Sequence, residues 1–205
     1  MNSTKVYLRR FEPEDYKKIN AWRKDENLYL LTTGSRYFVS SERDRQWVLD
    51  TSLNNTTDLY LAVCLVKNHL FIGYVSLSDI DHRNRRAEWS GIVIGEKEYR
   101  GQGYATEAVY LLLEYAFYEL GLRRVSGSWL AENAVSLFLG KMMGFRHEGL
   151  LREYVYKNGK HHDVIIMSML RPEFENLKQR YEDCGATSDE KACSETSVLL
   201  TRSPK

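Results

Sequence analysis

One helix and the loop before it constrain the fold more than any other segment of this sequence. Residues 104–120 carry apolar side chains on nearly every face, which is typical of a helix buried on most sides. A run rich in Ile and Val, residues 88–95, predicts a strand before it, and Gly101 and Gly103 lie in the connecting loop. We therefore expect a domain whose other elements pack around this helix.

The remaining pattern predicts one α/β domain with the order β-α-α-β-β-β-α-β-α-β-β. Its clearest turn is Asn158-Gly159, a dipeptide that favours a tight hairpin between two strands. No internal repeat or second domain is visible. The expected strands are residues 6–11, 60–66, 70–77, 88–95, 124–130, 149–156 and 161–170, and the expected helices are residues 13–24, a segment from Ser41, residues 104–120 and residues 133–143.

The character of the sequence changes after Pro172. Residues 176–205 hold one aromatic side chain, Tyr181, among many Ser, Thr, Glu and Lys. Such a composition predicts a frayed helix end followed by a mostly disordered tail. We therefore expect a domain over residues 1–175 and a tail over residues 176–205.

The charge balance excludes several classes of protein. The chain has 205 residues, and its 29 Lys and Arg against 28 Asp and Glu give a net charge of +1, which argues against a dedicated nucleic-acid or membrane-surface protein. No apolar run approaches the about 20 residues that span a bilayer, and the first residues lack a signal-peptide core. Cys64, Cys184 and Cys193 are too scattered for a disulfide framework or a zinc site. We expect a cytoplasmic protein.

The loop between the strand and the buried helix has the chemistry of an anion site. Glycine lets a backbone turn tightly and approach a ligand, and the first N–H groups of a helix attract anions. Arg100 can add a charge-assisted contact. The alternative is that Gly101 and Gly103 only build a tight turn. Two known phosphate loops are excluded, because GxxxxGK[ST] is absent and Thr106 stands where GxGxxG needs its third glycine.

Residues 100–105, RGQGYA, match the [RQ]-x-x-G-x-[GA] signature of the GCN5-related N-acetyltransferase (GNAT) superfamily. The resemblance extends in order over residues 6–170, and it is strongest to the branch of ribosomal-protein alanine and spermidine N-acetyltransferases. It implies a mixed, mostly antiparallel seven-stranded sheet with helices on both faces. The supporting segments are residues 8–15, 85–89, 132–136, 144–145 and 156–163.

The resemblance also implies how acetyl-CoA, the co-substrate, is bound. Loop amides would hold the pyrophosphate, the strand before the loop would offer a free edge to the pantetheine arm, and an asparagine would contact that arm. The residues that match these roles are Arg100, Gly101, Gln102, Gly103, Tyr104, Ala105 and Thr106 for the loop, Ile92, Val93 and Ile94 for the strand, and Asn133 for the asparagine.

Direct attack of an amine on the thioester requires a base and an acid. Glu88 is the expected base, because partial burial at a strand start raises a carboxyl pKa. The alternatives are a salt bridge to Arg85 or Arg86 and a simple solvent-facing strand position. Many relatives have a tyrosine acid seven residues after the asparagine, where this chain has Gly140. Ser136 matches a serine of the ribosomal-protein branch and becomes the candidate acid, against an ordinary helix position as the alternative.

The acceptor is less constrained than the cofactor. A protein N-terminus, a polyamine, an amino sugar and an aminoglycoside all remain open, and so does a CoA-binding sensor without turnover. Dimers are common among relatives, so a homodimer is possible. Adjacent strand side chains point to opposite faces, so His161-His162-Asp163 predicts a polar cluster and no metal site. The aromatic residues expected near the acceptor are Trp22, Tyr29, Tyr37, Trp47 and Tyr60, of which Trp22 and Trp47 favour packing.

Overall fold

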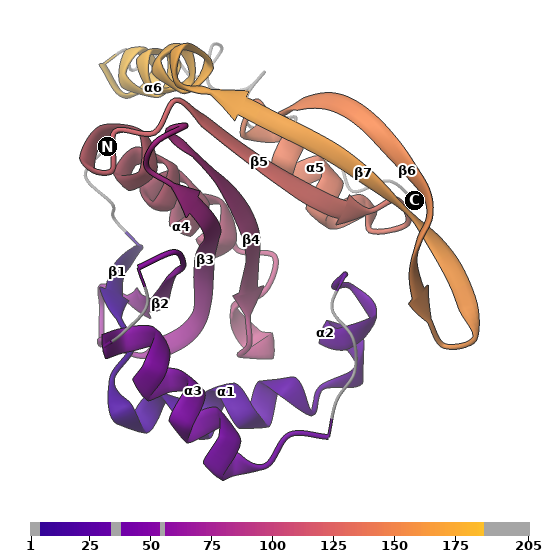
Figure 1. Cartoon of the computed structure of the whole chain (residues 1–205). Helices are drawn as coiled ribbons and strands as arrows, with labels where there is room; N and C mark the ends of the chain where they lie inside the picture. The colour runs from indigo at the N-terminus through magenta and orange to yellow at the C-terminus, as the bar shows by residue number, and fades with distance from the viewer. Residues whose placement is uncertain (1–4, 34–37, 54–55, 187–205) are drawn as a thin grey trace.

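The computed structural model describes residues 5–33, 38–53 and 56–186 and shows one seven-stranded sheet with helices on both faces (Figure 1). The strand order is β1-β2-β3-β4-β5-β7-β6. This confirms the predicted fold class. The strands are β1 (Val6–Arg10), β2 (Leu59–Leu65), β3 (Phe71–Asp81), β4 (Arg86–Ile94), β5 (Arg124–Leu130), β6 (Arg146–Lys157) and β7 (Lys160–Leu170).

Every neighbouring pair of strands is antiparallel except β4 and β5, which run parallel. A parallel pair needs a crossover connection, and α4 (Tyr104–Glu114) supplies it. The tight turn between β6 and β7 places Asn158 and Gly159 at φ +48° and +79°, the conformation that a two-residue hairpin of this type requires. The sheet is therefore mixed at one position only.

Two apolar cores lie on the two faces of the sheet. On one face, α1 (Tyr16–Arg23) and α3 (Ser41–Leu53) cover β1 to β3, with Ile19 and Val48 fully buried. On the other face, α4 packs with α5 (Ala134–Met142), and Leu112 and Leu113 have no exposed surface. The near-complete burial of α4 agrees with its apolar character on almost every face.

Three segments differ from the sequence-based expectation. No helix was expected between residue 24 and Ser41, but the structure has a short helix there, α2 (Glu26–Leu30), whose Asn27 N–H donates to the capping side chain of Asp25. The expected helix 104–120 ends as a single π-helical turn over Tyr115–Glu119. A final helix, α6 (Arg171–Ala186), runs through the expected boundary at 175/176 and buries Leu177 in the core. Residues 187–205 of the expected tail lie outside the described residues.

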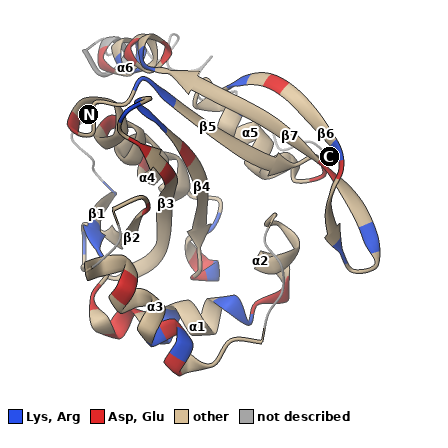
Figure 2. Ribbon diagram, in the orientation of Figure 1, with Lys and Arg blue, Asp and Glu red and all other residues tan. Residues whose placement is uncertain are grey.

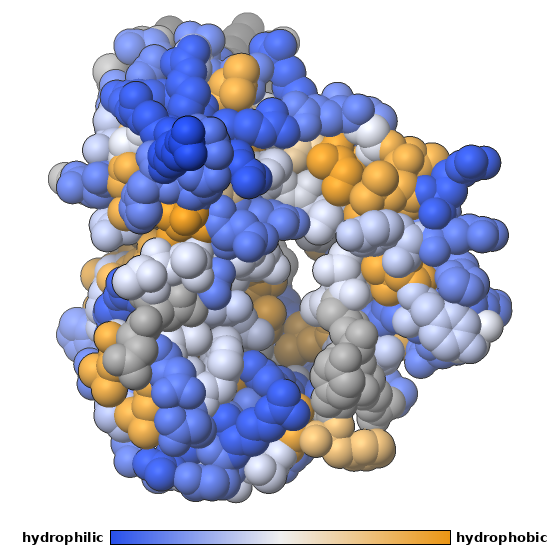
Figure 3. All heavy atoms as spheres, in the orientation of Figure 1, coloured by the Kyte–Doolittle hydropathy of each residue, from blue (hydrophilic) through white to orange (hydrophobic). Residues whose placement is uncertain are grey.

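The β6 strand forms one edge of the sheet, and most of its side chains are exposed. Among them are Leu150 and Leu151, and the space-filling view shows apolar side chains gathered over this part of the molecule (Figure 3). Within the described residues, no helix combines the length and the apolar character needed to cross a membrane.

Candidate functional site

The site begins where β4 and β5 separate. The two strands pair only from Arg86 with Arg124 to Trp89 with Gly127. Directly after this point, β4 contains an extra residue, because Trp89 pairs with Leu77 of β3 while Gly91 pairs with Ser76. Such a bulge bends and twists a strand, and Gly91 adopts φ +147°, a conformation that favours glycine. The bulge therefore turns β4 away from β5.

The separated strands enclose a cleft of about 300 Å³. Residues Ser90 to Ile94 line it from β4, and their other edge pairs with β3, so no strand of the described chain occupies the edge that faces β5. After Glu88 in β4 and after Arg124 in β5, neither strand carries a charged residue (Figure 2). The space-filling view shows this face of the molecule hollowed at its centre (Figure 3). The cleft thus combines apolar walls with unpaired backbone groups.

The glycine loop lies at one end of this cleft and leads into α4. Gly101 and Gly103 have φ +73° and +83°, and a Cβ at Gly101 would meet nothing within 4 Å, so conformation and not space requires the glycine there. The first helical bond of α4 runs from the Glu107 N–H to the Gly103 carbonyl, at 3.2 Å. The N–H groups of residues 104–106 lie ahead of that bond and can receive an anion.

Lys5, directly before β1, contacts this loop, and the sequence did not indicate this contact. Its ammonium donates to the Gln102 carbonyl at 3.3 Å, and its backbone N–H donates to Glu107 at 3.1 Å. A cation therefore stands beside the loop that was predicted to hold the pyrophosphate. Lys5 is 97 residues from Gln102 in the chain and matches no motif, so only the fold brings them together.

The side chain of Arg100 lies within the fold instead of extending into solvent. Its guanidinium donates to the carbonyls of Ile94 and Gly95, both at 2.8 Å, and to Asp25 at 3.2 Å. Burial by itself raises the pKa of the Asp25 carboxyl, but the hydrogen bond from Arg100 helps to hold this pKa below its ordinary value. Arg100 thus ties the start of α2 to the glycine loop, and its charge is already paired.

Glu88 and Ser128 are joined across the point of separation. The Ser128 hydroxyl donates to Glu88 Oε1 at 3.0 Å, and Ser128 lines the cleft while Glu88 stands behind it. The two arginines considered as partners for Glu88 lie elsewhere: Arg85 donates to the Gly121 carbonyl at 2.8 Å, and Arg86 lies 3.7 Å from Asp81. The hydroxyl of Ser128 therefore connects the Glu88 carboxylate with the cleft.

Asn133 and Ser136 lie at the start of α5 and line the same cleft. Asn133 accepts a hydrogen bond from the Ser136 N–H at 3.0 Å, which caps the helix, and donates to the Leu31 carbonyl at 2.7 Å. Gly140 lies behind the wall: a Cβ there would come within 2.8 Å of Met167 and 3.2 Å of Trp129. A side chain at position 140 would therefore have to displace the end of Met167 and crowd the indole of Trp129.

A second cavity of about 420 Å³ adjoins the cleft on the side of α1 and α3. It shares Ser90, Gly91 and Val93 of β4 with the cleft. Four of the five aromatic residues that were expected near the acceptor line this cavity, and the fifth, Tyr37, lies outside the described residues. The four are Trp22, Tyr29, Trp47 and Tyr60, and Tyr74 is a further lining residue that the sequence did not indicate.

Helix α2 and the turn after it form part of the wall of both cavities, through Leu28 and Thr32. Two side chains from the other half of the chain hold its C-terminal end. Asn133 donates to Leu31, and the buried ammonium of Lys157 donates to the carbonyls of Tyr29 and Thr32, at 2.5 Å each. Figure 1 shows α2 between β4 and the β6–β7 hairpin. The wall therefore depends on contacts between distant segments.

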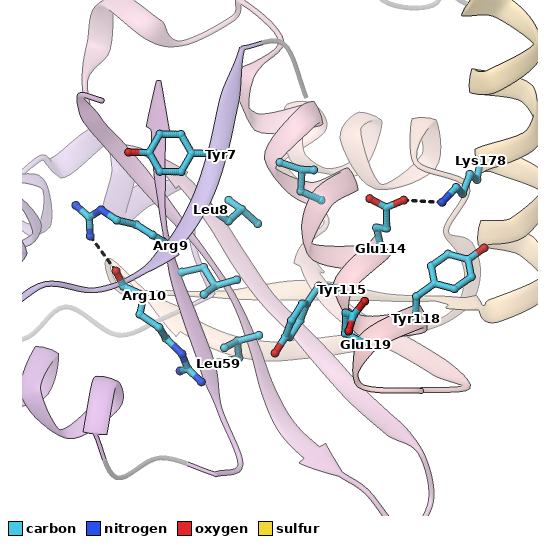
Figure 4. Close-up of a pocket in the computed structure, with 12 residues that line it drawn as sticks. Tyr7, Leu8, Arg9, Arg10, Leu59, Glu114, Tyr115, Tyr118, Glu119 and Lys178 are labelled. Carbon is cyan, nitrogen blue, oxygen red and sulfur yellow. Dashed lines mark hydrogen bonds and ion pairs between the residues drawn. The ribbon is translucent and has the colours of Figure 1, made fainter. Parts of the chain in front are cut away.

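Another groove, of about 670 Å³, lies between β1–β2 and the end of α4, and Figure 4 shows its lining. Glu114 and Lys178 form an ion pair of 2.6 Å across one side of it. This groove shares no lining residue with the cleft. His161 and His162 also face different partners, since His161 contacts the Glu153 carbonyl and His162 contacts Glu132. Neither feature belongs to the site.

Comparison with known proteins identifies the family. The acetyltransferase (GNAT) domain matches residues 5–146. The chain belongs to the GNAT family of acetyl-CoA-dependent N-acetyltransferases. The free edge of β4 and the glycine loop with its N–H groups fit a ligand that carries a pyrophosphate and an amide-containing arm, and these are the features of CoA.

Named relatives agree with this assignment. The putative ribosomal N-acetyltransferase YdaF of Bacillus subtilis is 31% identical over 180 residues, which cover 84% of this chain and 95% of that protein. The spermidine N(1)-acetyltransferase of Escherichia coli K12 is 32% identical over 102 residues, 50% of this chain and 54% of that protein. A solved structure, spermidine N-acetyltransferase from Vibrio cholerae in complex with CoA and spermine, superposes with a TM-score of 0.77 at 26% identity, covering 85% of this chain and all of that chain.

Proposed function

We propose that this GNAT protein transfers the acetyl group of acetyl-CoA to a primary amine by direct attack, with both substrates bound together. The observation that carries the proposal is the shared wall of the two cavities. Ser90, Gly91 and Val93 line both the cleft and the aromatic cavity, so one short segment of β4 adjoins both substrates. A reaction without a covalent enzyme intermediate needs such an arrangement.

The cofactor would be held mainly by backbone groups. The N–H groups of the loop and of the first turn of α4 would bind the pyrophosphate, with the Lys5 ammonium beside them. The backbone groups of Ile92, Val93 and Ile94 on the free edge of β4 would pair with the pantetheine arm. When bound, acetyl-CoA supplies the acetyl group as a thioester.

Glu88 would act as the base through Ser128. An alkyl ammonium has a pKa of about 10, so the amine must lose a proton before it can attack. Ser128 lines the cleft and already donates to Glu88 Oε1 at 3.0 Å. Its hydroxyl would take the proton from the amine side and pass its own proton to the carboxylate. This relay connects a carboxylate behind the wall with the reacting groups.

Ser136 would give a proton to the departing thiolate. Its backbone N–H is fixed by Asn133, and the residue lines the cleft at the start of α5. Tyr154 and Tyr156 also carry hydroxyls, but they are strongly exposed side chains of β6 and do not line the cleft. Ser136 is therefore the better candidate of the three.

The packing of Gly140 favours one other function, a CoA-binding sensor. Position 140 carries no side chain, and Trp129 and Met167 crowd the place where one would start, so the tyrosine acid common in relatives is missing here. A chain without an effective acid would bind acetyl-CoA and turn it over slowly.

Two measurements on the full chain separate these functions. Acetyl-CoA binding is measured by calorimetry, and CoA release is followed with a panel of primary amines. Saturable, amine-dependent release supports the transferase. Tight binding of acetyl-CoA with no release for any amine contradicts it and supports the sensor.

A further inference from the structure

The aromatic cavity beside the cleft has almost no charge on its walls. Five aromatic side chains line it, together with aliphatic residues and the hydroxyls of Thr32, Thr33, Ser76 and Ser90. The only charged side chain among its described lining residues is Arg23. The five aromatic residues are Trp22, Tyr29, Trp47, Tyr60 and Tyr74.

Three carboxylates on or beside the elements around this cavity contact other groups of the protein. Asp44 is fully buried. It forms an ion pair with Arg23 at 3.1 Å and accepts a hydrogen bond from the Asn20 amide at 2.7 Å. Asp58, beside Tyr60, accepts from the Asp79 N–H at 3.2 Å. Glu88 accepts from Ser128. None of the three lines the cavity, and residues 34–37, which lie outside the described part, have the sequence GSRY and contain no acid.

This lining suits a polycation poorly. A polyamine brings two or more ammonium groups besides the one that reacts, and a cation taken from water needs a carboxylate or a ring face. The rings could serve one such group, but Arg23 would repel the others, and the described residues of the wall include no carboxylate. Spermidine and spermine would therefore lose hydration without gaining ion pairs.

The same lining suits an aromatic or apolar body that carries one anionic group. Ring faces and edges provide the contact area. Arg23 lies 4.7 Å from the Trp47 ring centre and engages Asp44 through Nη1, and its guanidinium carries further N–H groups that would donate to a carboxylate. Arg23 and Asp44 together form a pair without net charge. The carboxylate of the acceptor would add a hydrogen-bonded partner to this neutral pair.

We infer that the acceptor is a small primary amine on an aromatic or apolar frame with a carboxylate, and that it is not a polyamine. The inference rests on the transferase function proposed above. It assigns Arg23 as the residue that binds the carboxylate and the aromatic cavity as the site of the frame.

The test is the rate of CoA release by the full-length protein with matched amines. Phenylalanine and phenethylamine differ by the carboxylate alone, butylamine lacks the ring, and spermidine represents the polyamines. We expect kcat/KM to be highest for phenylalanine and at least about tenfold lower for spermidine. Saturable release that is fastest with spermidine, or with a peptide N-terminus, overturns the inference and leaves the transferase intact. Binding of acetyl-CoA without release for any amine overturns the transferase itself.

A variant examines the assigned residue. Arg23→Lys keeps the charge beside Asp44 but removes the planar fork. We expect the KM for phenylalanine to rise about tenfold while the KM for phenethylamine stays the same. Lys24→Gln, at an exposed position of the same helix end, is the control. An equal change for both amines shows that Arg23 does not bind the carboxylate. The substrate panel on the native protein decides the inference even if Arg23→Lys does not fold.

Discussion

The Nζ atom of Lys157 lies 2.5 Å from the carbonyl oxygen of Tyr29 and 3.9 Å from the centre of its ring. The two residues are 128 positions apart in the chain. Burial lowers the pKa of the Lys157 ammonium, and Thr32 provides a second carbonyl at 2.5 Å. A lysine from the β6–β7 hairpin thus caps the C-terminal end of α2, the helix that lies beside both cavities.

Replacing this lysine should loosen α2. Lys157→Met keeps the length of the side chain but leaves two carbonyls without their donor, at a cost of about 1–3 kcal/mol. We expect a lower melting temperature and a higher KM for the amine, because Leu28 and Thr32 line the acceptor cavity. Lys160→Met, at an exposed position of the same hairpin, should change neither. Equal behaviour of the two variants would show that Lys157 does not position α2.

The glycine loop gives a prediction about cofactor affinity. Gly103 is the N-cap of α4 at φ +83°, and a branched side chain there disfavours this conformation and crowds the loop amides. Gly103→Val should therefore weaken acetyl-CoA binding at least about tenfold by calorimetry. Gly149→Ala serves as the control, since a Cβ there would meet nothing within 4 Å. Unchanged affinity in Gly103→Val would remove the loop from the cofactor site.

The relay predicts that Glu88 and Ser128 act as one unit. Glu88→Gln should lower kcat about 100-fold with little change in acetyl-CoA affinity, because the base acts in the chemical step. Ser128→Ala should lower kcat as well, and the double variant should be no slower than Glu88→Gln alone. Ser126→Ala is the control, because Ser126 lies two residues before Ser128 on β5. Additive losses in the double variant would contradict a shared proton route.

The sequence predicted the sheet and the strand–loop–helix around the paired glycines because both depend on local pattern, whereas the aromatic residues near the acceptor were expected only from the family resemblance. Apolar periodicity marked β4 and α4, and the paired glycines marked the turn between them. The short helix α2 escaped prediction because distant donors stabilise it, and Lys5 and Tyr74 carried no motif. Arg100 matched the family signature, yet the fold directs its guanidinium to Asp25 and two carbonyls. Tertiary contacts of this kind leave no trace in a single sequence.

Gly140 shows how packing limits a local reading. Its match to a tyrosine position in relatives suggested a lost catalytic group, and the structure adds that Trp129 and Met167 fill this space. Gly140→Ala should overpack the wall at a cost of about 1–3 kcal/mol, against a gain of about 1 kcal/mol in helix propensity, so the free energy of unfolding should fall by up to about 2 kcal/mol. Chemical denaturation measures this, with Gly149→Ala as the matched control. A variant as stable as the native protein would show that Trp129 and Met167 move aside easily.

The ion pair of Arg124 with Glu148 at the far end of β5 predicts a pH dependence of stability. The hydrogen bonds from Arg124 and Ser168 lower the pKa of Glu148 from 4.5 to about 2. A carboxyl with a lowered folded pKa stabilises the protein above its unfolded pKa, and this contribution is lost as the pH falls from about 4.5 to about 2. Because the Glu148 side chain is more than a third exposed, screening limits the effect to roughly 1 kcal/mol or less.

Glu148→Gln should therefore be less stable than the native protein at pH 7, and the difference should shrink toward pH 2. Glu119→Gln, an exposed residue of the π-helical turn, is the control. Denaturant titrations at pH 7, 4 and 3 test this. A stability difference between Glu148→Gln and the native protein that stays the same as the pH falls would contradict the assigned ion pair.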